Sequence, residues 1–315
     1  MISVQDVAFT IHRTTILHNI SFAIPKIGIS ALVGENGAGK TTLIRLLSGY
    51  LQPSSGKIEI LQRQHPDPTI SIQMGILSEN PPIYEELRVG EYLDFVAQIR
   101  SVQDIRKAKE HVLKLLELQD VEDSYISTLS KGFRQRVGLA QALIHQPKIL
   151  ILDEPFIGLD PVQKKSLRNT MLKIAEQSLI VLSSHNLDDI EQIASEIIFI
   201  EEGELKFHRD ISQLREEQNQ YVVVRFNMGT SVISIKELLK NNSITRIIPH
   251  LEQIKTQDAP SDNADMLYTE FLIKTTSDIP HHQIFESIVG FCRQHQLHIE
   301  EIYRYKPRLE EILLA

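Results

Sequence analysis

The sequence predicts an α/β protein of two domains, and three observations carry this prediction. From residue 1 to about residue 210, short apolar runs alternate with segments of helical period, which is typical of a largely parallel sheet surrounded by helices. A glycine loop stands between an apolar run at 29–33 and a helical segment. After residue 210 the pattern changes to short strands with fewer helices. The length of 315 residues also suits about two domains.

Composition excludes several classes of protein. Apolar residues make up 42% and charged residues 23% of the chain, as in ordinary globular proteins. The net charge of −8 argues against nucleic acid as a partner, because nucleic-acid binders usually present a basic face. Cys292 is the only cysteine, so no intramolecular disulfide can form. The sequence shows neither a signal peptide nor an apolar run approaching the roughly 18 residues of a membrane span, so we expect a cytoplasmic protein.

The first domain, 1–210, is read from apolar spacing and chain breakers. Asp160 followed by Pro161 is a favoured helix start. A helical subdomain is expected at about 80–145. The predicted strands are 29–33, 149–152 and 179–183, and the predicted helices are 41–48, 90–99, 105–118 and 134–144.

The second domain, 211–315, shows no nucleotide-binding motif. Its predicted order is β-α-β-β-α-β, the split pattern of ferredoxin-like domains. The strands are expected at 221–226, 244–249, 267–273 and 297–303, the helices at 233–240 and 283–292, and a short final helix at 307–314. This accessory domain is either a regulatory or dimer-stabilising module or a passive fold, and the sequence does not choose between these alternatives.

A phosphate-binding loop of the form G-x-x-x-x-G-K-[ST] follows the first buried strand. Its glycines let successive backbone N–H groups point at phosphate oxygens, and the following helix adds its positive end. Lys40 would neutralise the β- and γ-phosphates, and the Thr41 hydroxyl would bind Mg²⁺. A glycine turn that binds nothing is the alternative, which the strand before and the helix after argue against. The candidate nucleotide-binding residues here are Gly34, Glu35, Asn36, Gly37, Ala38, Gly39, Lys40, Thr41 and Thr42.

Two acids follow the apolar run at 149–152, at the end of a strand where open α/β sheets bind ligands. Asp153 fits the position that holds Mg²⁺ through its waters, and Glu154 would act as general base on the attacking water. Two solvated acids without a role are the alternative. The glycine loop elsewhere in the chain makes the catalytic interpretation the stronger one.

The segment 129–136 reads Leu-Ser-Lys-Gly-Phe-Arg-Gln-Arg and precedes a predicted helix. Ser130 supplies a hydroxyl and Gly132 an open backbone, both at the positive end of that helix, where an anion is favoured. A simple N-capping turn at Ser130 is the alternative interpretation.

In this order the motifs resemble the nucleotide-binding domain of ATP-binding cassette (ABC) proteins over the first two-thirds of the chain. The segment 129–136 is similar to the family signature, 158–160 to its D-loop and 183–185 to its switch loop. The resemblance implies ATP and Mg²⁺ as cofactors and a dimer. Ser130 and Gly132 would reach the γ-phosphate held by the partner subunit, and Asp160 would cross near the partner's glycine loop. His185 would hydrogen-bond the γ-phosphate and align the water with Glu154.

The chain departs from the family pattern at several positions. Glu79 stands where the Q-loop glutamine is expected, and its oxygen can still contact Mg²⁺ or its waters. Lys131 and Phe133 replace common letters of the signature, and Ile11 stands where an aromatic ring normally stacks on adenine. The segment formed by Glu79 and the prolines that follow it resembles the same region in the ATPases of type-2 ABC exporters.

We therefore expect the ATP-hydrolysing subunit of an ABC export system, as a homodimer or a heterodimer with a related ATPase. A separate transmembrane permease would dock around residues 79–88 and hold the protein at the cytoplasmic face of the membrane. A soluble ABC-type regulatory factor and a degenerate, purely structural cassette are the alternatives. No second cassette, long coiled coil or lost catalytic residue favours either.

A last cluster, Cys292, His295 and His298, has a spacing that superficially suggests a metal site. The side chains need not converge at a helix end, and no second cysteine completes a structural zinc set. We expect no metal there.

Overall fold

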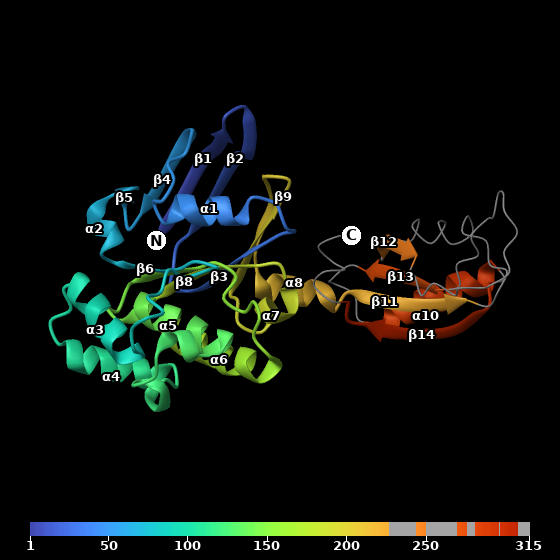
Figure 1. Ribbon diagram of the computed structural model, residues 1–315. Coiled ribbons are helices and arrows are strands. Elements are labelled where there is room, and N and C mark those ends of the chain that lie inside the picture. The colour runs from blue at the N-terminus through green and yellow to red at the C-terminus, as the bar shows by residue number, and fades with distance from the viewer. Residues whose placement is uncertain (227–243, 250–269, 276–280, 296, 308–315) are drawn as a thin grey trace, which may run out of the picture. The chain divides into compact units, whose positions relative to one another are not determined.

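The computed structural model describes residues 1–226, 244–249, 270–275, 281–295 and 297–307 (Figure 1). The chain forms two compact units, Met1–Ile211 and Ser212–Ala315. The helix predicted at 233–240, and the one predicted at 307–314 except for its first residue, lie outside the described residues.

A six-stranded sheet forms the centre of the first unit, in the order β10-β9-β3-β8-β7-β6. All neighbours are parallel except β10, which pairs antiparallel with β9 at one edge. The apolar runs predicted as strands are three of its central members, and they are buried along their length because helices and a second sheet cover them. The strands are β3 (Gly28–Val33), β6 (Met74–Leu77), β7 (Ile149–Leu152), β8 (Leu179–Ser184), β9 (Glu196–Glu201) and β10 (Glu204–Asp210).

A separate antiparallel sheet, β2-β1-β4-β5, was not anticipated by the sequence interpretation, which expected one largely parallel sheet. Its strands bury only one face, so apolar residues alternate with polar ones, as Ile2, Val4, Val7 and Phe9 show in β1. That alternation was the feature of the sequence from which this sheet could have been predicted. The strands are β1 (Ile2–Ile11), β2 (Thr14–Ile24), β4 (Ser55–Ile60) and β5 (Arg63–Gln64).

Helix α1 (Lys40–Leu47) lies between the two sheets (Figure 1). Leu43, Leu46 and Leu47 are buried in one apolar cluster with residues of β1, β2 and β4 on one side and of β3, β7 and β8 on the other. The helix that follows the glycine loop is therefore held from both sides, and the loop at its N-terminus is held with it.

Three helices, α3 (Val89–Ile99), α4 (Ile105–Leu115) and α5 (Lys131–Leu143), pack on one another in the region expected to be helical. Two boundaries differ from the prediction by three residues each, and the others agree within one residue. Helix α5 begins before residue 134 because Ser130 caps it, and α4 ends at Leu115, followed by 3₁₀ turns at Gln119–Val121 and Ile126–Thr128. Helix α5 lies very close to β6: a Cβ added to Gly75 would be 2.1 Å from the Ala142 carbonyl oxygen.

The remaining helices of the first unit are α2 (Pro68–Ser71), α6 (Pro161–Ile174) and α7 (Leu187–Glu191). Helix α6 starts with Asp160 and Pro161, as predicted, and Asp160 and Gln163 form a reciprocal capping box. Helix α8 (Ile211–Gln218) begins where the first unit ends.

The second unit contains an antiparallel sheet in the order β12-β13-β11-β14, with α10 (His281–Gln294) packed on it. Its strands are β11 (Tyr221–Phe226), β12 (Ile244–Pro249), β13 (Glu270–Thr275) and β14 (Ile299–Tyr305). The small C-terminal sheet domain expected from the sequence is therefore present. Cys292 is buried in its apolar cluster and His295 stacks on Phe291. Among the described residues no group of three His, Cys, Asp or Glu side chains could hold a metal ion.

None of the helices in the described part of the chain is long and apolar enough to cross a membrane.

A buried polar cluster ties the two strands at one edge of the large sheet to its centre. The Ser30 hydroxyl of β3 donates to Glu196 Oε1 of β9 at 2.5 Å, and His208 Nε2 of β10 lies 2.6 Å from Glu196 Oε2. Burial by itself would raise the pKa of Glu196, but the hydrogen bonds from His208 and Ser30 outweigh it and hold this pKa below its ordinary value. The carboxylate therefore stabilises the fold in its charged form.

This cluster predicts a pH-dependent loss of stability in Glu196→Gln. We expect a loss of about 1.5–3 kcal/mol at pH 7 in urea unfolding followed by circular dichroism, because hydrogen bonds to a charge are lost. The stabilisation is fully present above the unfolded pKa of about 4.5 and disappears as pH falls through the lower folded pKa, so the two proteins should converge in acid. Glu201→Gln, at the exposed end of β9, is the control and should cost about 0.5 kcal/mol or less. A difference that is constant with pH would contradict the assignment.

Candidate active site

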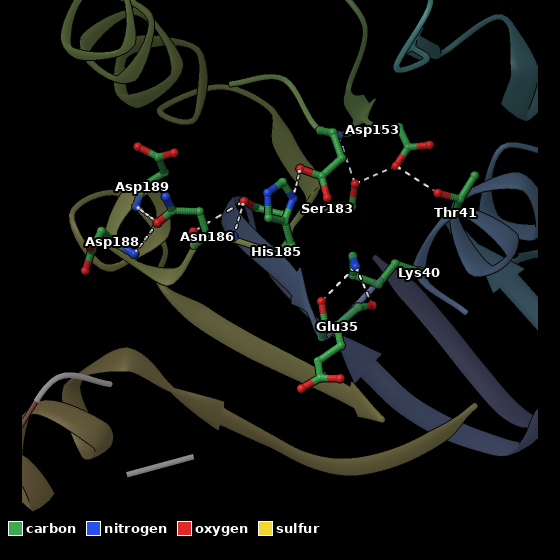
Figure 2. Close-up of polar contacts among 12 residues, drawn as sticks. Glu35, Lys40, Thr41, Asp153, Ser183, His185, Asn186, Asp188 and Asp189 are labelled. Carbon is green, nitrogen blue, oxygen red and sulfur yellow. Dashed lines mark hydrogen bonds and ion pairs between the residues drawn. The ribbon is translucent and has the colours of Figure 1, made fainter. Parts of the chain in front are cut away.

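The glycine loop, the acid pair and His185 meet at the carboxyl ends of three adjacent parallel strands. The glycine loop follows β3, Asp153 and Glu154 follow β7, and His185 follows β8, which lies between the other two strands. Figure 2 shows Lys40, Thr41, Asp153 and His185 facing a common space. Side chains 112 residues apart in the chain, such as those of Thr41 and Asp153, are thus neighbours.

Lys40 is folded back over its own loop. Its Nζ donates to the carbonyl oxygens of Gly34 at 2.7 Å and Glu35 at 2.9 Å, and the residue is only 6% exposed. Gly37 and Gly39 have φ values of 87° and 103°, a region that favours glycine, so the loop conformation explains both residues. Burial lowers the pKa of Lys40, and the nearby carboxylates of Glu154 and Asp153 partly oppose this effect.

Ser183 connects the two acids. Its hydroxyl donates to Asp153 Oδ1 at 2.5 Å and accepts from the backbone N–H of Glu154 at 2.9 Å. The Thr41 hydroxyl donates to the same Asp153 oxygen at 3.5 Å. Hydroxyl and carboxylate oxygens are the ligands that Mg²⁺ prefers, so Thr41 and the buried Asp153 form a pair suited to that ion. No separate role was predicted for Ser183 from the sequence. The available indication was a polar residue near the end of an otherwise apolar strand.

Glu154 is held in a backbone conformation that is uncommon for a residue with a side chain. Its φ is 49°, so the chain turns sharply after Asp153 and directs the carboxylate toward the switch loop. Glu154 Oε2 lies 3.0 Å from His185 Nδ1. A carboxylate and an imidazole at this distance can hold a water and transfer its proton.

A cavity of about 540 Å³ opens over these groups. It contains nine of the predicted site residues, together with Ile16 and Ile157, which the sequence interpretation did not select. Glu79 lines the same cavity as Glu154. The lining consists of Ile16, Asn36, Gly37, Gly39, Lys40, Thr41, Thr42, Glu79, Glu154, Ile157 and His185. Ile11, counted from the sequence as the base-stacking position, is 44% exposed near the end of β1 and is not part of this lining.

Ser130, Gly132 and Asp160 are not among the residues that line the cavity. Ser130 caps α5, accepting from the backbone N–H of Phe133 at 3.4 Å, and Asp160 caps α6. The two segments interlock, since a Cβ on Gly132 would lie 2.8 Å from the Gln163 side chain. Within one chain, the signature segment and the D-loop therefore form one surface and the cavity forms another.

Comparison with known proteins places this arrangement in a family. The family model for ABC transporters matches residues 17–157. The ABC transporter ATP-binding protein YxlF of Bacillus subtilis is 31% identical over 243 residues, covering 76% of this chain and 78% of that protein. The chain belongs to the ABC transporter ATP-binding proteins. Members of this family are ATPases, so the chain is an ATP-hydrolysing cassette.

Two further similarities agree with this membership. The bacitracin transport ATP-binding protein BcrA of Enterococcus faecalis is 32% identical, with 74% of this chain and 76% of that protein covered. A solved ATP-binding subunit of an ABC transporter is 28% identical and superposes with a TM-score of 0.62, covering 68% of this chain and 92% of its own.

The position of Ser183 predicts its effect on this ABC ATPase. In Ser183→Ala we expect kcat for ATP to fall about 10–100-fold, because Asp153 and Glu154 lose the group that orients both. Ser178→Ala is the matched control: this buried serine just before β8 donates to the Pro147 carbonyl at 2.7 Å, at the opposite end of the strand. It should lose comparable stability, about 1 kcal/mol, with kcat retained. Equal loss of kcat in both variants would contradict the assignment.

Proposed function

We propose that this ABC ATPase is the energy-supplying subunit of an export system, acting as a dimer that closes around two ATP molecules and drives a separate membrane permease. One observation carries the proposal. The cavity is lined by the glycine loop, Glu79, Glu154 and the switch histidine, whereas Ser130, Gly132 and Asp160 lie outside it. A second chain is needed to bring a signature segment to the open side of the cavity.

The residues of one chain suit defined steps of hydrolysis. The glycine loop N–H groups and Lys40 bind the β- and γ-phosphates, with Lys40 exchanging its internal carbonyl partners for phosphate oxygens. Thr41 directly, and Asp153 and Glu79 through waters, would hold Mg²⁺, which would supply positive charge against the phosphates. Glu154 accepts a proton from the attacking water, and His185 aligns that water with the γ-phosphate.

The partner chain contributes the remaining groups. Its signature segment presents the exposed Ser130 at the N-terminus of α5, where the helix dipole favours an anion, with Gly132 in the first turn beneath the Gln163 side chain. Its Asp160 lies at the start of α6, next to the same surface. The arrangement supports a symmetric head-to-tail pair, either of two copies of this chain or with a related ATPase.

The permease is proposed to dock on an exposed apolar surface made by Tyr84, Phe95 and Ile99. Phe95 and Ile99 lie four residues apart on one face of α3, and the Tyr84 ring meets the Phe95 ring edge-on at 5.6 Å. Their exposed fractions are 54%, 39% and 65%. The loop bearing Tyr84 follows β6 and includes Glu79, which lines the cavity, so one continuous loop connects the cavity to this surface.

Similarity to the bacitracin transport protein supports transport as the task. The type-2 exporter features around Glu79 support the outward direction. In this proposal the chain sits at the cytoplasmic face of the membrane through its permease, and the cargo is selected by that permease.

The shared site predicts that two inactive variants restore each other. Lys40→Ala removes phosphate binding in the chain that carries it, and Ser130→Arg blocks the signature surface offered to the partner. Each protein alone should be inactive, but a mixture should recover ATPase activity. In the mixed dimer the intact glycine loop of the Ser130→Arg chain faces the intact signature of the Lys40→Ala chain.

The matched control is a mixture of Lys40→Ala with Glu154→Gln. Both changes act in the chain that carries them, so neither site of the mixed dimer is complete and no activity should return. Absence of recovery in the first mixture, or equal recovery in both, would contradict the shared site.

The docking surface predicts a loss of permease binding without loss of turnover. Tyr84→Ala and Phe95→Ala should abolish copurification with the permease, because the apolar contact area is removed. The isolated variants should keep their ATPase activity. Tyr50→Ala, at a tyrosine that is 70% exposed elsewhere, is the control and should copurify normally. Normal copurification of both surface variants would refute this docking site.

A further inference from the structure

A buried ion cluster joins helix α6 to helix α7. The Asp189 carboxylate of α7 is 7% exposed and binds two cations of α6: Lys164 Nζ at 2.6 Å and Arg168 at 3.3 Å. Lys164 and Arg168 are four residues apart and therefore lie on the same face of α6. Neither cation nor the acid lines the cavity.

Helix α7 begins at Leu187, two residues after His185. Asn186 is its N-cap, and the Asn186 side chain accepts from the backbone N–H groups of Asp188 at 2.9 Å and Asp189 at 3.4 Å. Figure 2 shows this short connection between the histidine and the two acids. With a single capping residue between them, the orientation of α7 sets the position from which His185 reaches Glu154.

Helix α6 begins at the D-loop. Asp160 and Gln163 form its cap, and the Gln163 side chain covers Gly132 of the signature segment. Lys164 follows Gln163 directly. Asp160 and Gln163, which lie at the surface that a chain offers to its partner, therefore belong to the start of α6, the helix whose cations bind Asp189.

The cluster is stiff for a physical reason. A carboxylate removed from water is stable only while its cations stay in place, because separating them leaves uncompensated buried charge. Two cations one helical turn apart also prevent α7 from sliding along α6. Displacement of either helix is therefore transmitted to the other.

We propose that Asp189 is a positioning residue that ties His185 to the D-loop, so that the γ-phosphate contact in a chain's own site and the groups it offers to its partner move together. The inference rests on the proposed shared-site dimer. It assigns to Asp189, Lys164 and Arg168 the link between the two ATP sites.

The mixed dimer of Ser130→Arg and Lys40→Ala chains tests this link, because it contains one complete site. The Ser130→Arg chain supplies His185 to that site, and the Lys40→Ala chain supplies the D-loop. Asp189→Asn is introduced into one chain at a time. We expect a loss of turnover of about 10-fold or more in both placements, because the link orients His185 in one chain and the D-loop in the other.

Asp188→Asn is the matched control. Asp188 lies beside Asp189 in the first turn of α7, is exposed, and loses the same charge at the same helix end. It should leave turnover unchanged in both placements. The melting temperature of every chain is measured, and the assay is run at a temperature at which all of them are folded. ATP affinity, measured with a fluorescent ATP analogue, should be unaffected by Asp189→Asn.

Each outcome has a defined meaning. If turnover falls only when Asp189→Asn is in the chain that supplies His185, Asp189 merely supports His185 locally and the link is overturned. Unchanged turnover in both placements also overturns the link. Loss of ATP affinity equal to the loss of turnover also overturns it, since a general distortion of the fold would then explain the effect. Absence of activity in the mixed dimer before Asp189 is changed means that the proposed shared site has failed, which is a separate result.

Discussion

Parallel pairing of β3, β8 and β7 is the constraint on which the rest of the site depends. It brings three carboxyl ends to one edge, so that the glycine loop, the acid pair and His185 converge from distant parts of the chain. Ser183, near the end of the middle strand β8, connects it to the residues after β7 through hydrogen bonds with the Asp153 carboxylate and the backbone N–H of Glu154. Apolar packing on both faces of these strands leaves little freedom for their ends to shift.

On these rigid strands the site carries one residue in an uncommon backbone conformation and one lysine that is hydrogen-bonded to its own loop. Glu154 occupies a left-handed backbone conformation, and Lys40 binds carbonyl oxygens of its own loop. Both arrangements are held by the surrounding fold. In the proposed ATP complex, phosphate oxygens would offer Lys40 stronger partners than the neutral carbonyls do. Helices α6 and α7 surround the same region, and the Asp189 cluster joins them away from the cavity.

The motifs made much of the fold and site predictable. Strands at 149–152 and 221–226 were placed to the residue, because continuous apolar runs are buried on both faces or bounded by clear breaks. The antiparallel sheet of β1, β2, β4 and β5 was missed, since its alternating pattern carries a weaker signal than a glycine loop. Ile16 and Ile157 were missed for another reason: apolar residues beside a cavity look like core residues until the chain is folded.

The sequence by itself determined the chemistry: a glycine loop with Lys40 and Thr41, two acids ending a buried strand, and a histidine ending another are local patterns with local causes. Only the tertiary structure decided the distances between them and which residues share a cavity, because strand order and helix packing depend on contacts between distant segments. It also decided that the signature segment and the D-loop lie apart from the cavity, interlocked through Gln163 and Gly132. No local pattern encodes that separation, since it arises from how α5 and α6 pack against each other.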